Sequence, residues 1–274
     1  MKRLSLVAVG VGCLIFQAQA TVLFSDGFNY TTGTYLGNDG AWGTGKASNL
    51  QIGSGNLTYS GLNDLGGNDL VVTSGASVSD INTYSSITSG SIYFSFLIDC
   101  TTLPTANNAL MALDPGTATP GQSSSSTAGA DGITAYTGAV TGGYKIGVRV
   151  MSSGSGAVYD TTDVLALNTV YLAVFEYTFG PGSQVGNLWV DPTPGGSQPT
   201  ALWTMSASAA TPAAIDNVGV KAQSAATQGA YFIDNVLVGT AWTDVTPASV
   251  PEPATFALAG LGMLGLVLAR RIRR

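Results

Sequence analysis

Apolar and polar residues alternate along several short segments of this chain, and this alternation most constrains its fold. In residues 171–179 the odd positions are aromatic or small, whereas Leu172, Val174 and Glu176 occupy the even positions. A period of two is the spacing of a β-strand whose two faces meet different surroundings. We therefore expect antiparallel strands with one packed face and one wetter face.

The same kind of segment recurs along most of the chain. Good helix formers are scarce and β formers are abundant, and Gly, Asn, Asp and Ser separate the apolar runs. The expected strands are residues 56–60, 69–73, 91–99, 132–136, 145–150, 171–179, 187–191, 215–221 and 231–238. Many short strands without helices between them predict an all-β fold, an antiparallel two-sheet jelly-roll sandwich, over residues 21–246.

Residues 1–20 have the parts of a secretory signal peptide. A basic pair follows Met1, an apolar segment comes next, and the small residues Ala18 and Ala20 precede the expected cleavage point. We expect export through the Sec translocon and a mature chain that begins near Thr21.

The other end of the chain combines a short motif, an apolar segment and a basic cluster. Pro251, Glu252 and Pro253 belong to an expected linker at residues 247–253, because each proline disfavours a helix before it. Residues 254–269 are apolar and approach the ~20 residues that a transmembrane helix needs. The arginines after this segment predict a cytoplasmic C-terminus by the positive-inside rule: Arg270, Arg271, Arg273 and Arg274.

This tail resembles the PEP-CTERM sorting signal of Gram-negative bacteria, in which the same three parts follow in the same order. The resemblance implies that an exosortase recognises and removes the tail at the inner membrane. The protein would then pass to the cell surface or the extracellular matrix. The alternative is a permanent single-span anchor, for which the motif at residues 251–253 has no role.

The exported region is strongly acidic. Six of the ten Lys and Arg residues and one of the sixteen acids lie in the two ends, which leaves four basic and fifteen acidic residues and a formal charge of −11. Such a surface repels nucleic acid. Cys100 is the single cysteine of this region, so it has no intramolecular disulfide.

Three segments of the exported region resemble the concanavalin A-like, or laminin-G-like, jelly rolls of exported bacterial proteins. They are the opening residues 23–30, the middle residues 171–179 with 187–192, and the closing residues 232–242. The resemblance implies a lectin-type sandwich whose first and last strands lie side by side. Members of this group bind glycans, bind proteins or hydrolyse polysaccharides, so the fold does not fix the function.

The residue types present argue against catalysis. The chain contains no histidine, which excludes Ser-His-Asp and Cys-His catalysis and every His-ligated metal site. Glycoside hydrolysis needs two carboxyl groups, and Glu176 is the only glutamate of the exported region. We assign no catalytic residue and place Glu176 on the solvated face of its strand. In a hydrolase, Glu176 with an aspartate partner would be the first residue to suspect.

No cofactor is expected, and one metal alternative stays open. Asp26 and Asp234 would approach each other if the first and last strands pair, and their oxygens suit a structural Ca²⁺. The other interpretation is that these Asx residues form turns. Glycan binding would use an exposed aromatic side chain, although core packing is the commoner fate of tryptophan. The candidates are Trp42, Trp189, Trp203 and Trp242.

Two classes of function remain. The first is a non-enzymatic surface or matrix protein that binds glycan within the exopolysaccharide layer. The second is a polysaccharide-active hydrolase on the same fold. Aspartates that line one groove would favour the hydrolase, and an uncharged concave face with aromatic side chains would favour the binding protein.

Overall fold

The structure is a computed structural model that describes residues 21–38, 42–43, 49–75, 78–115, 132–150, 158–159, 163–180, 184–207, 214–222 and 228–249. The expected signal peptide, with Ala18 and Ala20, and the segment from Val250 to Arg274 lie outside these residues. Within the described residues, no helix has the length and apolarity needed to cross a membrane.

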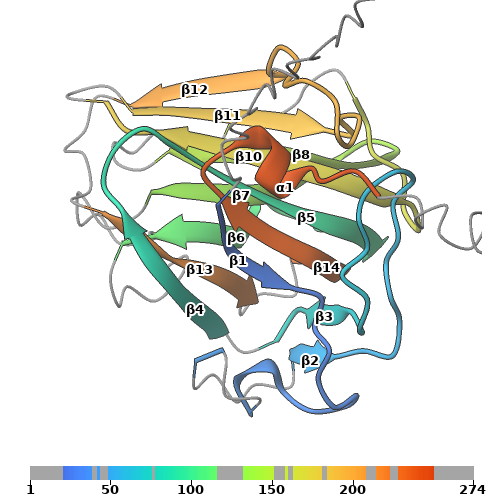
Figure 1. Cartoon of the computed structure of the whole chain (residues 1–274). Helices are drawn as coiled ribbons and strands as arrows, with labels where there is room; N and C mark the ends of the chain where they lie inside the picture. Colours follow the sequence, from blue (N-terminus) through green and yellow to red (C-terminus); the bar gives the residue numbers. More distant parts are fainter. Residues whose placement is uncertain are drawn as a thin grey trace, which may run out of the picture.

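Two antiparallel sheets pack face to face (Figure 1). The eight-stranded sheet runs in the order β12 (Trp203–Ala207), β11 (Gln184–Val190), β10 (Val170–Thr178), β5 (Ser91–Thr102), β14 (Ala230–Gly239), β3 (Leu70–Thr73) and β2 (Leu50–Ile52), and β1 (Val22–Asp26) also pairs with β14. The six-stranded sheet runs β4 (Val78–Ile87), β13 (Ile215–Ala222), β6 (Asn108–Asp114), β7 (Ile133–Val140), β8 (Gly143–Val150) and β9 (Val158–Tyr159). The described helices are a 3₁₀ turn at Leu36–Asn38 and α1 (Trp242–Val245).

Most of the strands predicted from alternation are present. The prediction for residues 56–60 is wrong, because this segment is a loop held against β14. The alternation did not reveal β6, whose residues are buried on both faces and therefore form a continuous apolar run. It also missed β4, which is mostly polar, and the short edge strand β12.

The main core lies between the two sheets. Its centre is a stack of three phenylalanines, with ring centroids 4.6 Å apart for Phe94 and Phe175 and 5.8 Å apart for Phe96 and Phe175. All three side chains are buried and share the inward face of β5 or β10. The predicted packed face of residues 171–179 is therefore confirmed.

The strand β14 has partners along both edges. One edge pairs with β5, whereas the other pairs first with β3, at residues 230–233, and then with β1, at residues 236–239. Asn235 stands between these two partners with a φ of 52°, a left-handed conformation that asparagine tolerates better than most residues. The expected pairing of the first and last strands is confirmed.

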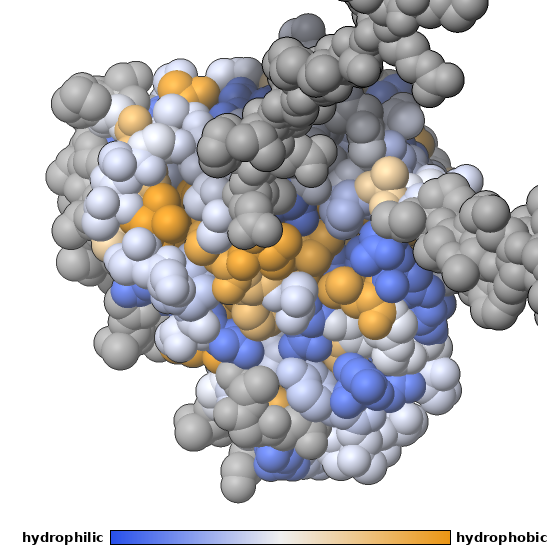
Figure 2. Space-filling view, in the orientation of Figure 1, coloured by the Kyte–Doolittle hydropathy of each residue, from blue (hydrophilic) through white to orange (hydrophobic). Residues whose placement is uncertain are grey.

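The outward face of the eight-stranded sheet is not wet, in contrast to the prediction. Leu172 and Val174, at the even positions of β10, are fully buried in a second apolar cluster with Trp189 and Trp242. Residues 57–65 and α1 supply the covering side chains. Figure 2 shows this side of the molecule, where apolar residues gather in the region of β1 and β14 and hydrophilic residues surround them.

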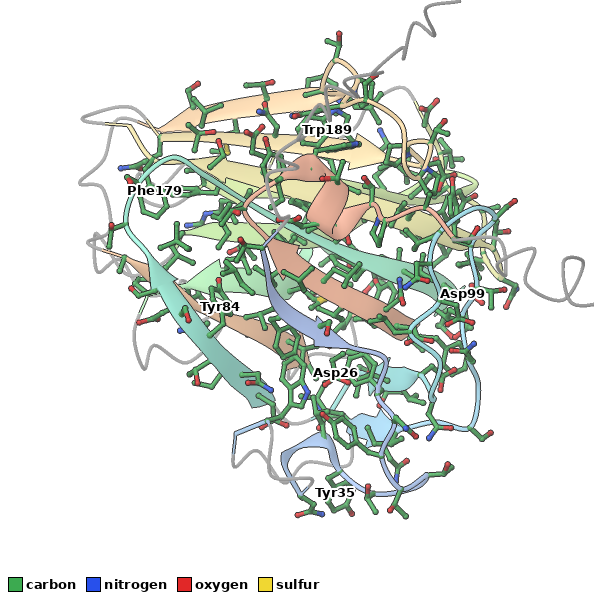
Figure 3. All side chains as sticks on the ribbon, in the orientation of Figure 1. Asp26, Tyr35, Tyr84, Asp99, Phe179 and Trp189 are labelled. Carbon is green, nitrogen blue, oxygen red and sulfur yellow. The ribbon has the colours of Figure 1, made fainter. Side chains whose placement is uncertain are left out.

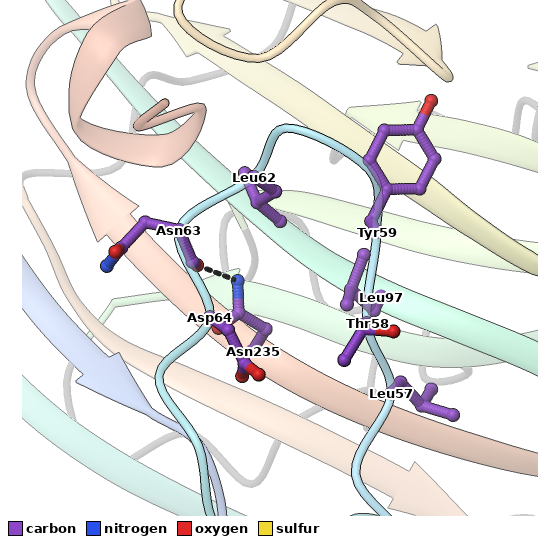
Figure 4. Close-up of a pocket in the computed structure, with 8 residues that line it drawn as sticks. All are labelled: Leu57, Thr58, Tyr59, Leu62, Asn63, Asp64, Leu97 and Asn235. Carbon is purple, nitrogen blue, oxygen red and sulfur yellow. Dashed lines mark hydrogen bonds between the residues drawn. The ribbon is translucent and has the colours of Figure 1, made fainter. Parts of the chain in front are cut away.

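Two adjacent side chains of β14 hold the covering loop in place. The Asp234 carboxylate accepts a hydrogen bond from the backbone N–H of Leu57 at 2.8 Å, and the side-chain Oδ1 of Asn235 accepts one from the Leu65 N–H at 2.9 Å. The Asn235 amide also donates to the Asn63 carbonyl oxygen at 3.3 Å (Figure 4). The pocket under this loop has a volume of about 40 Å³, which admits water but no sugar ring.

We predict that Phe175→Ala lowers the free energy of unfolding by about 3–5 kcal/mol, because it removes the ring that contacts both Phe94 and Phe96 in a closed core. Urea unfolding measures the loss. Phe179→Ala is the control, since Phe179 is only half-buried and packs at the margin of this core. Equal losses for the two variants would contradict the central place of the stack.

We also predict that Asp234 makes stability fall as pH rises. Burial, with lesser contributions from the negative Asp64 and Asp69, raises the pKa of Asp234 from 3.8 to about 7 against the hydrogen bonds from Leu57 and Asn235, which lower it. The folded protein holds this proton more tightly than the unfolded chain does. The contribution of protonated Asp234 to the free energy of unfolding is therefore largest below pH 3.8 and disappears as the pH approaches 7.

The Asp234→Asn variant should remove this part of the pH dependence. We compare the free energy of unfolding of the wild type with that of Asp234→Asn at each pH. The wild-type value minus the variant value should fall between pH 4 and pH 7, with a slope of at most about 1.4 kcal/mol per pH unit. Urea unfolding across this range measures it, with Asp163→Asn at an exposed position as the control. Parallel curves for the wild type and Asp234→Asn would contradict the prediction.

Candidate functional site

The basic residues of the described chain lie on one face of the molecule. Lys145 and Arg149 are on β8 and Lys221 is on β13, each between neighbours that point into the main core. Side chains of a strand alternate between its two faces, so all three cations lie on the outward face of the six-stranded sheet. This outward face is the candidate functional site.

A row of small and polar residues crosses this face. Strand pairing aligns five of them side by side from β4 to β8: Ile81, Gly219, Ala112, Thr134 and Arg149. Neighbours across strands share a face, so Gly219, which has no side chain, and Ala112, which has only a methyl group, make a low floor beside the longer Arg149. The hydroxyl of Thr134 is buried and has no hydrogen-bond partner in the described part of the chain.

Tyr136 and Arg149 form a polar and aromatic pair above this floor. The guanidinium Nη1 donates to the Tyr136 hydroxyl at 3.2 Å, and both side chains are half-buried. The residue paired with Tyr136 on β8 is Gly147, which has no side chain to cover the ring. An aromatic ring beside a planar guanidinium offers an apolar surface together with hydrogen-bond donors that suit hydroxyl and carboxylate groups.

Two aspartates approach the same part of the site from different strands. Asp114 ends β6 and pairs with Asn217 of β13, and Asp216 occupies the irregularity just before Asn217. The Tyr84 hydroxyl donates to the Asn217 carbonyl oxygen at 3.3 Å. Burial first, and then the negative charges of Asp114 and Asp216, raise the pKa of Tyr84 well above its usual value. Both carboxylates therefore act on one tyrosine.

Glu176 lies on the opposite side of the molecule, on the outward face of the eight-stranded sheet. Its exposed fraction is 8%, so the expectation of a solvated glutamate is wrong. The carboxylate accepts hydrogen bonds from the Tyr93 hydroxyl and the Asn187 amide at 2.8 Å each. Longer contacts from Thr178 and Gln198, at 3.4 Å each, complete its surroundings. These neighbours come from flanking strands and a covering loop, and they give Glu176 a structural task.

The tryptophan candidates are mostly core residues. Trp42, Trp189 and Trp242 are buried, and each indole N–H donates to a nearby oxygen, on Asp26, Pro199 and Gly196 respectively. The rings of Trp189 and Trp242 lie 5.0 Å apart, whereas Figure 3 shows Asp26, the hydrogen-bond partner of Trp42, well away from Trp189. Trp203 is half-buried on the edge strand β12. The interpretation that these tryptophans pack in the core is confirmed for three of the four candidates.

The aspartates that suggested calcium act as caps for loops. Asp26 accepts hydrogen bonds from the Phe28 N–H, the Tyr30 hydroxyl and the Trp42 indole, at 2.6 to 2.7 Å. Asp234 accepts its hydrogen bonds from the N–H groups of Leu57 and Asn235. Among the described residues, no group of three or more His, Cys, Asp and Glu side chains is placed to hold a metal ion. The geometry fits the interpretation that these Asx residues make turns.

Sequence reasoning missed most of this face. The alternation of Lys145 and Arg149 with apolar residues is visible in the sequence, and it places both cations outward. Nothing local to Asp114 or Asp216 indicates that both act on Tyr84, because strand pairing across a large sequence separation places Asp114 opposite Asn217. The sorting-motif residues Pro251, Glu252 and Pro253 and the terminal arginines lie outside the described residues.

Several solved structures resemble the chain in fold. Trypanosoma rangeli sialidase in complex with sialic acid has a TM-score of 0.42 and 11% identity over 86% of this chain, which spans only 33% of the sialidase. A carbohydrate esterase from the Shiga toxin-encoding bacteriophage phi24B has a TM-score of 0.47 and 14% identity over 80% of this chain and 98% of its own. A putative β-glucanase from Mycobacterium abscessus has a TM-score of 0.43 and 12% identity over 80% of this chain and 100% of its own. No curated protein sequence matches the chain.

The C-terminal segment matches a family model. Residues 249–274 match the family model of the PEP-CTERM protein-sorting motif, and these residues contain the motif, the apolar segment and the arginines noted in the sequence. The chain therefore carries a PEP-CTERM protein-sorting motif at its C-terminal end, which indicates an exported protein that an exosortase processes and that is destined for the cell surface.

Proposed function

We propose that the protein is a non-enzymatic component of the cell surface or extracellular matrix that binds polysaccharide through the outward face of the six-stranded sheet. The fold proposed for it is a concanavalin A-like jelly roll, in keeping with the pairing of β1 with β14. The sorting motif supports delivery to the surface, with the apolar segment 254–269 as a temporary membrane anchor.

The observation that carries the proposal is the position of this face relative to the point where the chain leaves the domain. Trp242 and Val245 of α1 pack into the apolar cluster on the outward side of the eight-stranded sheet. The described chain ends at Ser249, hydrogen-bonded to Gly61 on that same side. The site with Tyr136 and Arg149 is on the other sheet and points away from the attachment.

The cations at this face favour an anionic or hydroxyl-rich ligand. Lys145, Arg149 and Lys221 lie there beside Asp114, whereas Glu176 and Asp234, on the outward side of the other sheet, are buried acids without a basic partner among their hydrogen bonds in the described chain. A ligand with carboxylates, such as alginate, would be attracted to the first side and repelled by the second. Hydroxyl groups of a neutral glycan would use the half-buried Tyr136 hydroxyl and the Arg149 guanidinium as partners.

We predict that the purified protein is retarded in gels that contain host exopolysaccharide or alginate, and that Tyr136→Ala and Arg149→Gln each weaken binding about tenfold, the factor for 1.4 kcal/mol. Affinity electrophoresis at several polysaccharide concentrations gives the apparent Kd. Laminarin, xylan and agar, tested in parallel, separate a carboxylate preference from a general affinity for glycans. Added salt should weaken the binding of a polysaccharide with carboxylates more than the binding of a neutral polysaccharide.

Tyr35→Ala is the matched control, because Tyr35 is also half-buried but bridges Gln51 near β2 (Figure 3). It should bind like the wild type. Retardation that persists unchanged in Tyr136→Ala and Arg149→Gln would remove this face from the proposal. A lack of retardation by every polysaccharide would remove glycan binding itself.

The hydrolase stays as a second candidate because Asp114 and Asp216 both lie close enough to Tyr84 to raise its pKa. Glycoside hydrolysis requires a pair of carboxyl groups, which Glu176 alone does not supply. An assay for new reducing ends on the same five polysaccharides tests it, and the proposed binding protein should produce none. Turnover that Asp114→Asn abolishes and Asp163→Asn preserves would establish the enzyme in place of the binding protein.

A further inference from the structure

The chain is attached to the domain up to the start of the sorting motif. After α1, the Thr246 carbonyl oxygen accepts a hydrogen bond from the Gly195 N–H at 2.7 Å. The Pro247 carbonyl oxygen accepts one from Asn63 at 2.9 Å, and the Ser249 N–H donates to Gly61 at 2.8 Å. We name residues 246–249, with their partners at residues 61–63 and 195, the C-terminal clasp. The first part of the expected linker is thus bound to the domain.

The clasp has the geometry of a short antiparallel pair. Leu62 and Ala248 are opposite each other, and the hydrogen bonds of Asn63 and Ser249 flank this pair on both sides. In an antiparallel ladder, such a non-hydrogen-bonded pair has Cα atoms about 4.5 Å apart. Leu62 also forms a wall of the small pocket in Figure 4, so the clasp sits directly on the covering loop.

A glycine makes room for the clasp. Gly195 has a φ of 69°, and a Cβ atom built on it would lie 2.5 Å from the Cβ of Ala248. Any other residue at this position would be strained in its backbone and would push Ala248 away. The absence of a side chain at Gly195 therefore lets Ala248 pack directly against it, and the clasp depends on this contact.

Within the clasp, residues 247–249 are held less firmly than Thr246. Thr246 is fully buried and donates twice to the Trp242 carbonyl oxygen, and the Ser95 hydroxyl donates to the Val245 carbonyl oxygen at 2.6 Å. In contrast, Ala248 and Ser249 are exposed and have small side chains. Exposed backbone pairs of this kind open more readily than buried ones. Residues 247–249 can therefore leave the domain while α1 and Thr246 stay in place.

The clasp controls how far the sorting motif extends from the domain. The matched motif begins at Ser249, and Pro251 follows two residues later. With the clasp closed, Pro251 reaches at most ~7 Å beyond Ser249, because an extended chain spans about 3.5 Å per residue. With residues 247–249 released, the free chain starts at Thr246 and Pro251 reaches ~17 Å from it.

We propose that opening of the C-terminal clasp is required for exosortase processing and sets its rate. A processing enzyme must hold an extended chain on both sides of its recognition motif, and the closed clasp keeps the residues before Pro251 against the domain. The inference rests on the sorting motif at residues 249–274 and not on polysaccharide binding, so either can fail without the other.

The first arm of the test loosens the clasp in the full chain expressed in a host with its exosortase. Pulse–chase labelling follows loss of the C-terminal tail, and intact mass confirms the product. Gly195→Ala should be processed about fivefold faster, because the strained alanine destabilises the closed form. Gly142→Ala is the matched control: its φ is also positive, at 90°, but a Cβ there would meet nothing within 4 Å. This control should be processed at the wild-type rate.

The second arm locks the clasp. The Cα spacing of the Leu62 and Ala248 pair lies within the range of a disulfide, so Leu62→Cys with Ala248→Cys should cross-link in an oxidising compartment. The oxidised double variant should keep its tail, and a reductant should restore processing. Leu62→Cys alone controls for any loss of folding, and it should be processed normally with or without reductant.

Hydrogen exchange of the Ser249 amide in the purified full chain shows whether each variant changes the clasp as intended. Faster exchange together with faster processing in Gly195→Ala supports the proposal. Slower processing of Gly195→Ala would instead mean that the enzyme uses the closed clasp as a docking surface, and this would overturn it. Normal processing of the oxidised double variant would overturn it as well, whatever the loosened variant does.

Discussion

The pairing of β14 with three other strands is the constraint on which the structure depends. One edge of β14 completes the sheet with β5, and the other edge is divided between β3 and β1. The division falls at Asp234 and Asn235, whose side chains leave the ladder and bind the loop over the sheet. Strand order, the covering layer and the position of α1 all follow from this one strand.

The covering layer gives the two sides of the sandwich different properties. On the eight-stranded side, apolar residues such as Leu172 and Trp189 are sealed, and carboxylates such as Glu176 serve backbone and side-chain donors. On the six-stranded side, Arg149 and Tyr136 remain half-buried beside small residues. The same fold thus provides one side suited to holding the C-terminal segment and one side that is suited to a ligand.

Much of the fold follows from local sequence patterns, whereas most of the candidate site does not. Alternation locates β5, β8 and β10 because each has one purely apolar side. It fails for β6, which is buried on both sides, and for the loop at residues 56–60, whose alternation is real but whose partner is the Asp234 carboxylate. The exposure of Glu176 was also mispredicted, because a single strand carries no information about a second layer above it. The position of Asp114 opposite Asn217, next to Asp216 in the chain, depends on the register between β6 and β13, which only the folded sheet supplies.

The order of β14 in the chain has a consequence for biogenesis. This strand is the last of the sandwich in the chain, and β1, β3 and β5 all pair with it. A chain that crosses a membrane from its N-terminus cannot finish the eight-stranded sheet until residue 239 has emerged, when the apolar segment at residues 254–269 follows closely. Contacts between distant parts of a chain form slowly. Completion of the eight-stranded sheet therefore waits for the last strand of the sandwich, which ends only ten residues before the sorting motif begins at residue 249.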